Sequence, residues 1–126
     1  MDIQANFRRN LALLSEDTIR MEDMDEKLRP SLVSGSSRLT HNILSEGTKD
    51  TISLAFRLAM LEHLYPQGGA VAIFDDPFTD MDPRRREQAC RLLQTFAEKN
   101  QVLFLTCDSI YETLLTGHRI GLERNV

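Results

Sequence analysis

The part of the sequence that decides the fold reads AVAIFDDPFTDMDP and spans residues 70 to 83. Its first five residues form a short, continuous apolar run, which is typical of a strand buried in the middle of a parallel sheet. Two adjacent carboxylates, Asp75 and Asp76, follow this run directly. Asp82 is a suitable N-cap and Pro83 suits the first turn of a helix, so a helix is expected to begin there. The stretch therefore predicts a strand, an acidic turn and a helix, as in an α/β fold.

The segments on either side of this stretch extend the same pattern. Upstream, the residues from Ser45 to Pro66 are apolar on almost every side, which predicts a buried helix. Downstream, the sequence predicts a second buried strand, a short helix and a third strand, at residues 102–106, 108–115 and 119–122. The expected fold class is α/β, with a mainly parallel sheet and flanking helices.

The N-terminal part has a different character. Residues 2–28 lack glycine and proline, and Pro30 follows, so one long helix is predicted ahead of the sheet. Phe7, Leu14, Met21 and Leu28 recur every seven residues. This spacing fits either the end of a coiled coil or an amphipathic helix on a globular surface. The serine-rich and glycine-containing residues 30–43 predict a loop, in which a short strand around Leu32 and Val33 has room. The expected division is a helix over 1–29 and an α/β lobe over 30–126.

Composition narrows the class of protein. A chain of 126 residues is expected to form one domain. The net charge of -4 argues against a free-standing basic nucleic-acid binder. The sequence offers no apolar stretch long enough for a membrane span, and a cytoplasmic protein without membrane contact is expected. Two cysteines, Cys90 and Cys107, are too few and too widely spaced for a disulfide framework or a CxxC metal pair.

Four short segments carry residue types suited to chemistry. The Asp75–Asp76 pair at a strand end suits Mg²⁺, a hard ion that takes one or two carboxylates and otherwise binds water and phosphate. Ser45 and Gly47 precede a helix, whose free backbone N–H groups can bind an anion, and the glycine allows close approach to the backbone. Residues 79–82 and 105–108 are expected at the same edge of the sheet. Each segment alone is also explained as a turn or a helix cap.

In this order, the segments resemble the C-terminal lobe of an ABC-type ATPase head of the SMC, SbcC and RecF-like branch, and look most like the YhaN-type SMC-like ATPases. Leu44–Thr48 resembles the signature motif, and Val71–Asp76 resembles the Walker B strand. Thr79–Asp82 resembles the D-loop, and Leu105–Asp108 resembles the switch strand. The resemblance implies that the chain is the C-terminal half of a P-loop ATPase head.

The resemblance also implies the cofactors ATP and Mg²⁺ and a role for each site residue. Asp75 would hold Mg²⁺, and Asp76 would polarise the attacking water. Asp82 of the D-loop and Cys107 of the switch strand would complete the catalytic set. The γ-phosphate of the opposing protomer would be bound by the signature residues Ser45, Gly47 and Thr48. The implied partners are a second head joined through ATP, and DNA, in DNA repair or chromosome maintenance.

The sequence departs from the family pattern at three positions. Asp76 stands where the family has a glutamate and is one methylene shorter, so either the water would have to lie closer or the loop would have to move. Glu46 brings a negative charge close to a phosphate site. Cys107 or Asp108 replaces the switch histidine, and neither donates a hydrogen bond as histidine does. These departures predict weak or partner-dependent hydrolysis.

The chain contains no GxxxxGK[ST] loop, since none of its six glycines is followed by lysine. Without that loop nothing holds the α- and β-phosphates, so the chain alone is expected to be inactive. The loop would come from an N-terminal P-loop lobe of the same or a partner chain. One alternative is a non-catalytic interaction lobe that docks a partner through residues 2–28. A second is a phosphoryl-transfer domain of the response-regulator type. Such domains need a lysine on a late strand, whereas here the strand at 102–106 is followed by Cys107.

Overall fold

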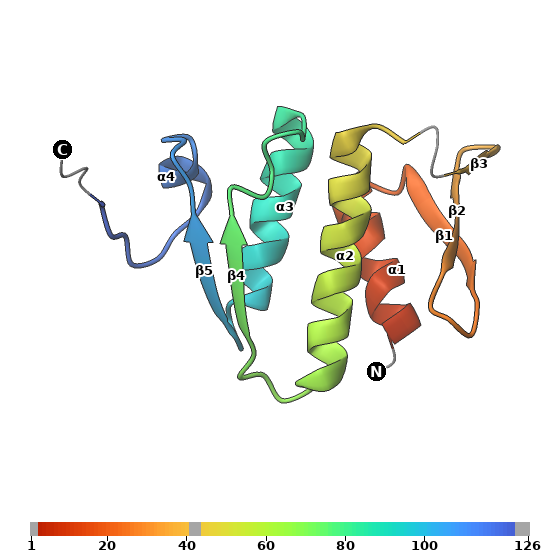
Figure 1. The fold of residues 1–126 in the computed structure, drawn as a ribbon, viewed down its shortest axis with the longest axis horizontal. Coiled ribbons are helices and arrows are strands. Elements are labelled where there is room, and N and C mark those ends of the chain that lie inside the picture. The colour runs from red at the N-terminus through yellow and green to blue at the C-terminus, as the bar shows by residue number, and fades with distance from the viewer. Residues whose placement is uncertain (1–2, 41–43, 123–126) are drawn as a thin grey trace.

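The structure, a computed structural model, describes residues 3–40 and 44–122. Met1 and Asp2 of the predicted helix, residues 41–43 of the predicted loop and residues 123–126 lie outside this range. The chain forms a mixed α/β fold in which helices lie between two small sheets (Figure 1). In chain order the elements are α1 (Ile3–Ser15), β1 (Ile19–Met24), β2 (Pro30–Ser34), β3 (Ser37–Leu39), α2 (Glu46–Leu64), β4 (Val71–Asp75), α3 (Pro83–Phe96), β5 (Gln101–Leu105) and α4 (Tyr111–Leu114).

The parallel sheet consists of β4 and β5, paired from Val71 with Gln101 to Asp75 with Leu105. Along β4 the side chains alternate, and Ala72 and Phe74 turn into the core. Arg57 of α2 lies over the Phe74 ring, with its guanidinium carbon 5.6 Å from the ring centroid. The α/β class, the parallel strands and the two helices α2 and α3 are thus confirmed.

The long N-terminal helix is wrong beyond Ser15, where α1 ends after 13 residues. Glu16 and Asp17 adopt left-handed backbone conformations, with φ of 52° and 64°, which a continuing helix does not allow. The Ser15 hydroxyl accepts a hydrogen bond from the Ile19 backbone N–H at 3.1 Å and so fixes the exit of the chain. The seven-residue spacing of apolar residues therefore does not describe one coiled-coil helix, because Met21 lies on a strand.

Residues 19–39 form an antiparallel sheet in the order β1–β2–β3, of which the sequence predicted only a short strand around Leu32. Ile19, Met21, Met24 and Leu32 turn into the core. The β1–β2 register shifts between Met21 and Asp23, and this irregularity brings Met24 back to the buried side. Of the segment 2–28, through which the alternative interpretation docks a partner, residues 3–15 are helical and residues 19–24 form a strand.

The helices α1, α2 and α3 pack against one another and form the centre of the molecule. Phe7 of α1 meets Phe56 of α2 edge to face at 5.7 Å between ring centroids. Asn10, fully buried in α1, donates its side-chain N–H to the Ala55 carbonyl oxygen at 3.2 Å. The largest fully buried apolar side chains are Phe7, Phe78, Leu11, Leu14, Leu58, Leu93 and Cys90.

The third predicted strand is also wrong: residues 119–122 form no strand. Ile120 and Leu122 are 73% and 85% exposed, and Arg119 pairs with Glu112 of α4 at 3.1 Å. Among the described residues, β5 pairs with β4 and with no third strand. Across the described residues, the structure has no helix long and apolar enough to cross a membrane.

Candidate functional site

The start of α2 carries three of the predicted site residues. Ser45 is the N-cap, and its hydroxyl oxygen accepts a hydrogen bond from the Thr48 backbone N–H at 3.2 Å. The same hydroxyl contacts the Thr48 hydroxyl at 2.9 Å. Glu46 turns its carboxylate to Lys49, 3.3 Å away, so its negative charge has a partner within the first turn. The first turn of α2 is thus ordered by its own side chains.

Gly47 is required by the neighbouring turn. A Cβ atom at this position would lie 2.4 Å from the Asp80 carbonyl oxygen and 3.2 Å from the Asp80 carbonyl carbon. Real Cβ atoms essentially never approach so closely, so only glycine fits without movement. The group that lies against Gly47 is the backbone of residue 80, and the approach of a ligand to the Gly47 backbone stays a prediction.

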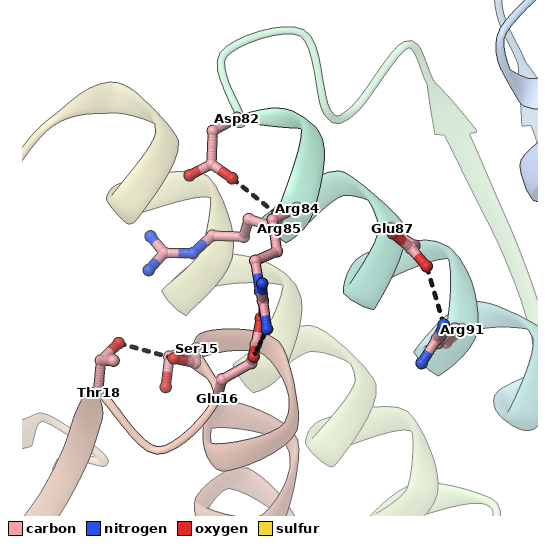
Figure 2. A network of polar contacts seen from close by, with 8 residues as sticks. All are labelled: Ser15, Glu16, Thr18, Asp82, Arg84, Arg85, Glu87 and Arg91. Atoms are coloured by element: carbon pink, nitrogen blue, oxygen red, sulfur yellow. Dashed lines mark hydrogen bonds and ion pairs between the residues drawn. The ribbon is translucent and has the colours of Figure 1, made fainter.

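The start of α3 joins the same cluster. Asp82 caps α3, with its carboxylate accepting a hydrogen bond from the Arg85 backbone N–H at 2.8 Å (Figure 2). The Arg85 guanidinium reaches back to the Thr48 hydroxyl at 3.5 Å. We call Ser45, Gly47, Thr48, Asp80, Asp82 and Arg85 the helix-start cluster. It places the first turns of α2 and α3 side by side, with the segment predicted as the D-loop between them.

Asp75 ends β4 and Asp76 follows it directly, and the two carboxylates face different surroundings. Asp75 is exposed, on the same side of β4 as Val71 and Ile73. Asp76 continues the ladder, since its backbone N–H donates to the Leu105 carbonyl oxygen at 2.7 Å. Its φ of 44° is unusual for a residue other than glycine, and such conformations occur often at functional sites.

The Asp76 carboxylate binds the segment that follows β5. One oxygen accepts a hydrogen bond from the Thr106 hydroxyl at 2.5 Å, and the other accepts one from the Cys107 thiol at 3.4 Å. We call Asp75, Asp76, Thr106 and Cys107 the strand-end cluster. The structure therefore brings together two of the segments that the sequence placed at one edge of the sheet.

These hydrogen bonds shift the pKa values of both partners. The Thr106 hydroxyl first, and then the Cys107 thiol and the positive charge of Arg86, hold the pKa of Asp76 below its usual value, although desolvation opposes the shift. The hydrogen bond and the negative charge of Asp76 raise the pKa of the Cys107 thiol. At neutral pH the cluster thus holds an ionised carboxylate beside a protonated thiol. Such a carboxylate can accept a proton or orient a water molecule.

The carboxylates of Asp75 and Asp76 are candidate metal ligands. Among residues 3–40 and 44–122, no group of three His, Cys, Asp or Glu side chains converges as a complete metal site. The Asp75 carboxylate forms no hydrogen bond or ion pair with the described residues and lies exposed at the strand end. One free carboxylate fits Mg²⁺, which keeps several waters and takes further oxygens from phosphate, and it does not fit a metal held entirely by protein.

The two clusters remain separate within the described residues, because no hydrogen bond or ion pair joins them. The sequence analysis assigned no role to Arg84, Arg85 or Arg86, and it missed that Arg85 reaches Thr48. It also missed the partner of Arg84: this side chain forms a two-pronged ion pair with Glu16, at 2.5 and 2.7 Å, which ties the end of α1 to α3 (Figure 2). No local signal could have found these partners, since they come from segments 37 and 68 residues away.

No family model matches the sequence, and no curated protein matches it significantly. Solved structures do match. An SMC head bound to the C-winged helix domain of ScpA aligns with 90% of this chain and 36% of its own, at a TM-score of 0.74 and 19% identity. A structure from work on ATP-driven dimerisation and DNA-stimulated activation of SMC ATPases aligns with 98% of this chain and 77% of its own, at a TM-score of 0.75 and 18% identity.

The chain has the fold of part of an SMC head domain. The SMC head domain of Thermotoga maritima agrees, with 90% of this chain and 40% of its own aligned at a TM-score of 0.66 and 23% identity. The aligned part is thus between about a third and three quarters of the length of these three chains. The resemblance to an SMC-type ATPase head, first drawn from four short motifs, is confirmed at the level of the fold.

Proposed function

We propose that the chain is the C-terminal lobe of an SMC-like ATPase head, one that hydrolyses ATP only together with a P-loop lobe. The observation that carries this proposal is the strand-end cluster: an ionised carboxylate at the end of a buried parallel strand, bound by the segment that ends the next strand. Ligands of open α/β sheets bind at this position, outside the carboxyl ends of the strands. The helix-start cluster and the SMC head fold support the same proposal.

The outer face of β4 and β5 is where the P-loop lobe would dock. Val71 and Ile73 are 57% and 59% exposed, and Leu103 and Leu105 are each 46% exposed. Parallel sheets are normally covered on both faces, whereas these side chains of β4 and β5 stay exposed among the described residues. An apolar sheet face of this kind favours a partner lobe that adds strands and covers the face.

Within the complete head each residue would have one task. When bound, Mg²⁺ would neutralise charge on the phosphates. Asp75 would hold that ion, and Asp76 would orient the attacking water, with Thr106 and Cys107 fixing its carboxylate. The helix-start cluster, through Ser45, Thr48 and the Gly47 backbone, would bind the γ-phosphate of the opposing protomer, so that ATP joins two heads. Asp82 would hold the D-loop segment at that interface.

The wider role follows from the same proposal. We assign the complete head to DNA repair or chromosome maintenance in the cytoplasm, with DNA as the larger partner. One of the matching structures comes from work on DNA-stimulated SMC ATPases, which supports this assignment. The YhaN-type branch is the subgroup that the motifs at residues 47–50 and 75–78 favour.

Calorimetric titration of ATP and Mg²⁺ tests the dependence on a P-loop lobe. The chain alone is expected to show no binding, because nothing in it holds the α- and β-phosphates. Mixed with the P-loop lobe encoded upstream or alongside, it is expected to gain both nucleotide binding and hydrolysis. Micromolar binding of ATP by the 126-residue chain alone would contradict the proposal.

In that assembled head, Asp76→Asn is expected to retain ATP binding and to slow hydrolysis by roughly 100-fold or more, since the base that orients the water is lost. Asp23→Asn, an exposed change on β1 at the far end of the molecule, is the matched control and is expected to leave the rate unchanged. If Asp76→Asn hydrolyses ATP at the parent rate, Asp76 is a turn residue only.

Ser45→Arg tests the second half of the site. It is expected to leave ATP binding by each head intact and to abolish ATP-driven dimerisation, because Ser45 is assigned to the nucleotide of the opposing protomer. Sedimentation with and without ATP measures the dimer. Ser45→Thr keeps the N-cap and is the control. A Ser45→Arg variant that still dimerises with ATP would remove Ser45 from the interface.

A further inference from the structure

Arg86, on the first turn of α3, lies between two segments that belong to different parts of the proposed site. Its guanidinium donates a hydrogen bond to the Met81 carbonyl oxygen at 3.3 Å. Its central carbon lies 6.0 Å from the centroid of the Tyr111 ring on α4, within range of a cation–π contact. One side chain therefore touches both the turn before α3 and the segment after β5.

The surroundings of Arg86 are unusual for a cation. Its Nε atom is buried and has no hydrogen-bond partner among the described residues. It also forms no ion pair there, whereas Arg84 and Arg91 on the same helix pair with Glu16 and Glu87 (Figure 2). A partly buried charge without a carboxylate partner costs stability, so an ion pair does not explain an arginine at this position.

The aromatic groups beneath Arg86 connect it to the strand-end cluster. Tyr111 packs against Phe104 at 4.8 Å and against Phe78 at 6.3 Å between ring centroids, and Phe78 packs against Phe104 at 5.6 Å. Phe78 follows Asp76 by two residues, and Phe104 precedes Thr106 by two residues. The three rings thus join the chain on either side of the Asp76 hydrogen bonds, and Arg86 contacts one of them, the Tyr111 ring.

We propose that Arg86 is a positioning residue whose cation holds the turn at 79–82 and the segment at 106–111 in one fixed arrangement, through the Met81 carbonyl and the Tyr111 ring. That arrangement keeps Thr106 and Cys107 on the Asp76 carboxylate. Its consequence for hydrolysis rests on the proposed function, but the arrangement itself is a property of the chain without nucleotide.

The two cysteines provide a direct test. Cys107 is exposed and donates its thiol hydrogen to Asp76, whereas Cys90 is buried on α3. Alkylation of the folded chain by iodoacetamide at one fixed pH, followed by mass spectrometry, reports on each thiol separately. In Arg86→Met, the 106–111 segment is expected to loosen and Cys107 to react roughly threefold faster or more, because reactivity follows the thiolate fraction. Cys90 is expected to stay protected.

Arg84→Met is the matched control, since it removes a neighbouring arginine that contacts Glu16 instead. It is expected to leave the Cys107 rate unchanged. Arg86→Lys retains the cation and is expected to restore a rate close to that of the parent.

Three results would overturn the proposal. The first is an unchanged Cys107 rate in Arg86→Met. The second is a parallel rise at Cys90, which would show general loosening of the fold. The third is an Arg86→Lys rate equal to that of Arg86→Met, which would show that the charge is not what holds the two segments. None of these measurements involves nucleotide, so their outcome does not depend on whether the ATPase proposal is correct.

Discussion

The absence of a side chain at Gly47 sets the spacing of the helix-start cluster. The Asp80 carbonyl oxygen occupies the place where a Cβ atom would lie. This contact joins two backbone segments without any side chain, and it fixes the turn at 79–82 against α2. Asp82 then begins α3 by capping it. The residues that resemble the signature motif and the D-loop are therefore held together by the fold itself, before any nucleotide is present.

Gly47→Ala is expected to lower the free energy of unfolding by about 1 to 3 kcal/mol, because the added methyl group must push the Asp80 backbone away. Urea denaturation measures the change. Gly121→Ala is the control and is expected to have no effect, since a Cβ atom at Gly121 would meet nothing within 4 Å. An unchanged midpoint for Gly47→Ala would show that the turn at 79–82 moves freely.

At the scale of the element, the end of α1 decides the architecture of the N-terminal third. The Ser15 hydroxyl donates to the Leu11 carbonyl oxygen at 2.7 Å and accepts from the Ile19 N–H at 3.1 Å. It thereby closes the helix and starts β1. The turn brings Glu16 beneath α3, where Arg84 binds it (Figure 2).

Ser15→Ala is expected to cost about 1 to 3 kcal/mol of folding free energy, because the buried Ile19 N–H is left without its partner. Chemical denaturation measures the loss. Ser31→Ala serves as the control, because Ser31 is exposed on β2 and a surface change there is expected to be near neutral. Equal midpoints for the two variants would show that Ser15 does not fix the end of α1.

The Glu16–Arg84 pair should make stability depend on pH. The hydrogen bond from Arg84 is the largest cause that lowers the pKa of Glu16 from its usual 4.5. A carboxylate with a lowered pKa in the folded state stabilises the fold above its unfolded pKa, and this contribution is lost as the pH falls through the folded value.

The parent is therefore expected to be slightly more stable than Arg84→Met at neutral pH and to lose that advantage in acid. Both residues are exposed, so the difference is small. Urea denaturation at neutral and acidic pH, with a proton titration of Glu16 by NMR, measures it. A stability difference that persists unchanged in acid would contradict the assignment to this pair.

At the scale of the whole molecule, the described residues cover the β4–β5 sheet on one side and leave the other side exposed. Its outer face carries exposed Val71, Ile73, Leu103 and Leu105 on adjacent strands. The other face packs on the core through Ala72 and Phe74. One face of this sheet is thus buried in the core, and the other presents exposed apolar side chains.

Because of this face, the isolated chain is expected to self-associate at high concentration, and Ile73→Lys is expected to reduce that association without changing the melting temperature. Analytical ultracentrifugation measures it. Ile120→Lys, which removes an exposed apolar side chain away from the sheet, is expected to associate like the parent. Self-association of Ile73→Lys at the parent level would show that the outer face of β4–β5 is not the contact.

The sequence by itself determined the segment from β4 to the start of α3 and the nearly complete extent of α2. The signals there are local: an apolar run, an N-cap and a proline within 14 residues, and an apolar helix that ends before Pro66. The order of these segments also indicated an SMC-type head. A short-range pattern was enough because each element contains its own start and stop signals.

Only the tertiary structure decided where α1 ends, which partners the three arginines take, and how Asp76 is held. The apolar residues of 3–28 repeat every seven positions, and this spacing is equally compatible with a helix followed by an alternating strand. The choice depends on Ser15 and on burial of Met21 and Met24 against the core. Likewise, Asp76 meets Thr106 and Cys107 only because parallel pairing aligns two strands 30 residues apart. Contacts between distant segments leave no mark on local periodicity, and they decide the geometry of the site.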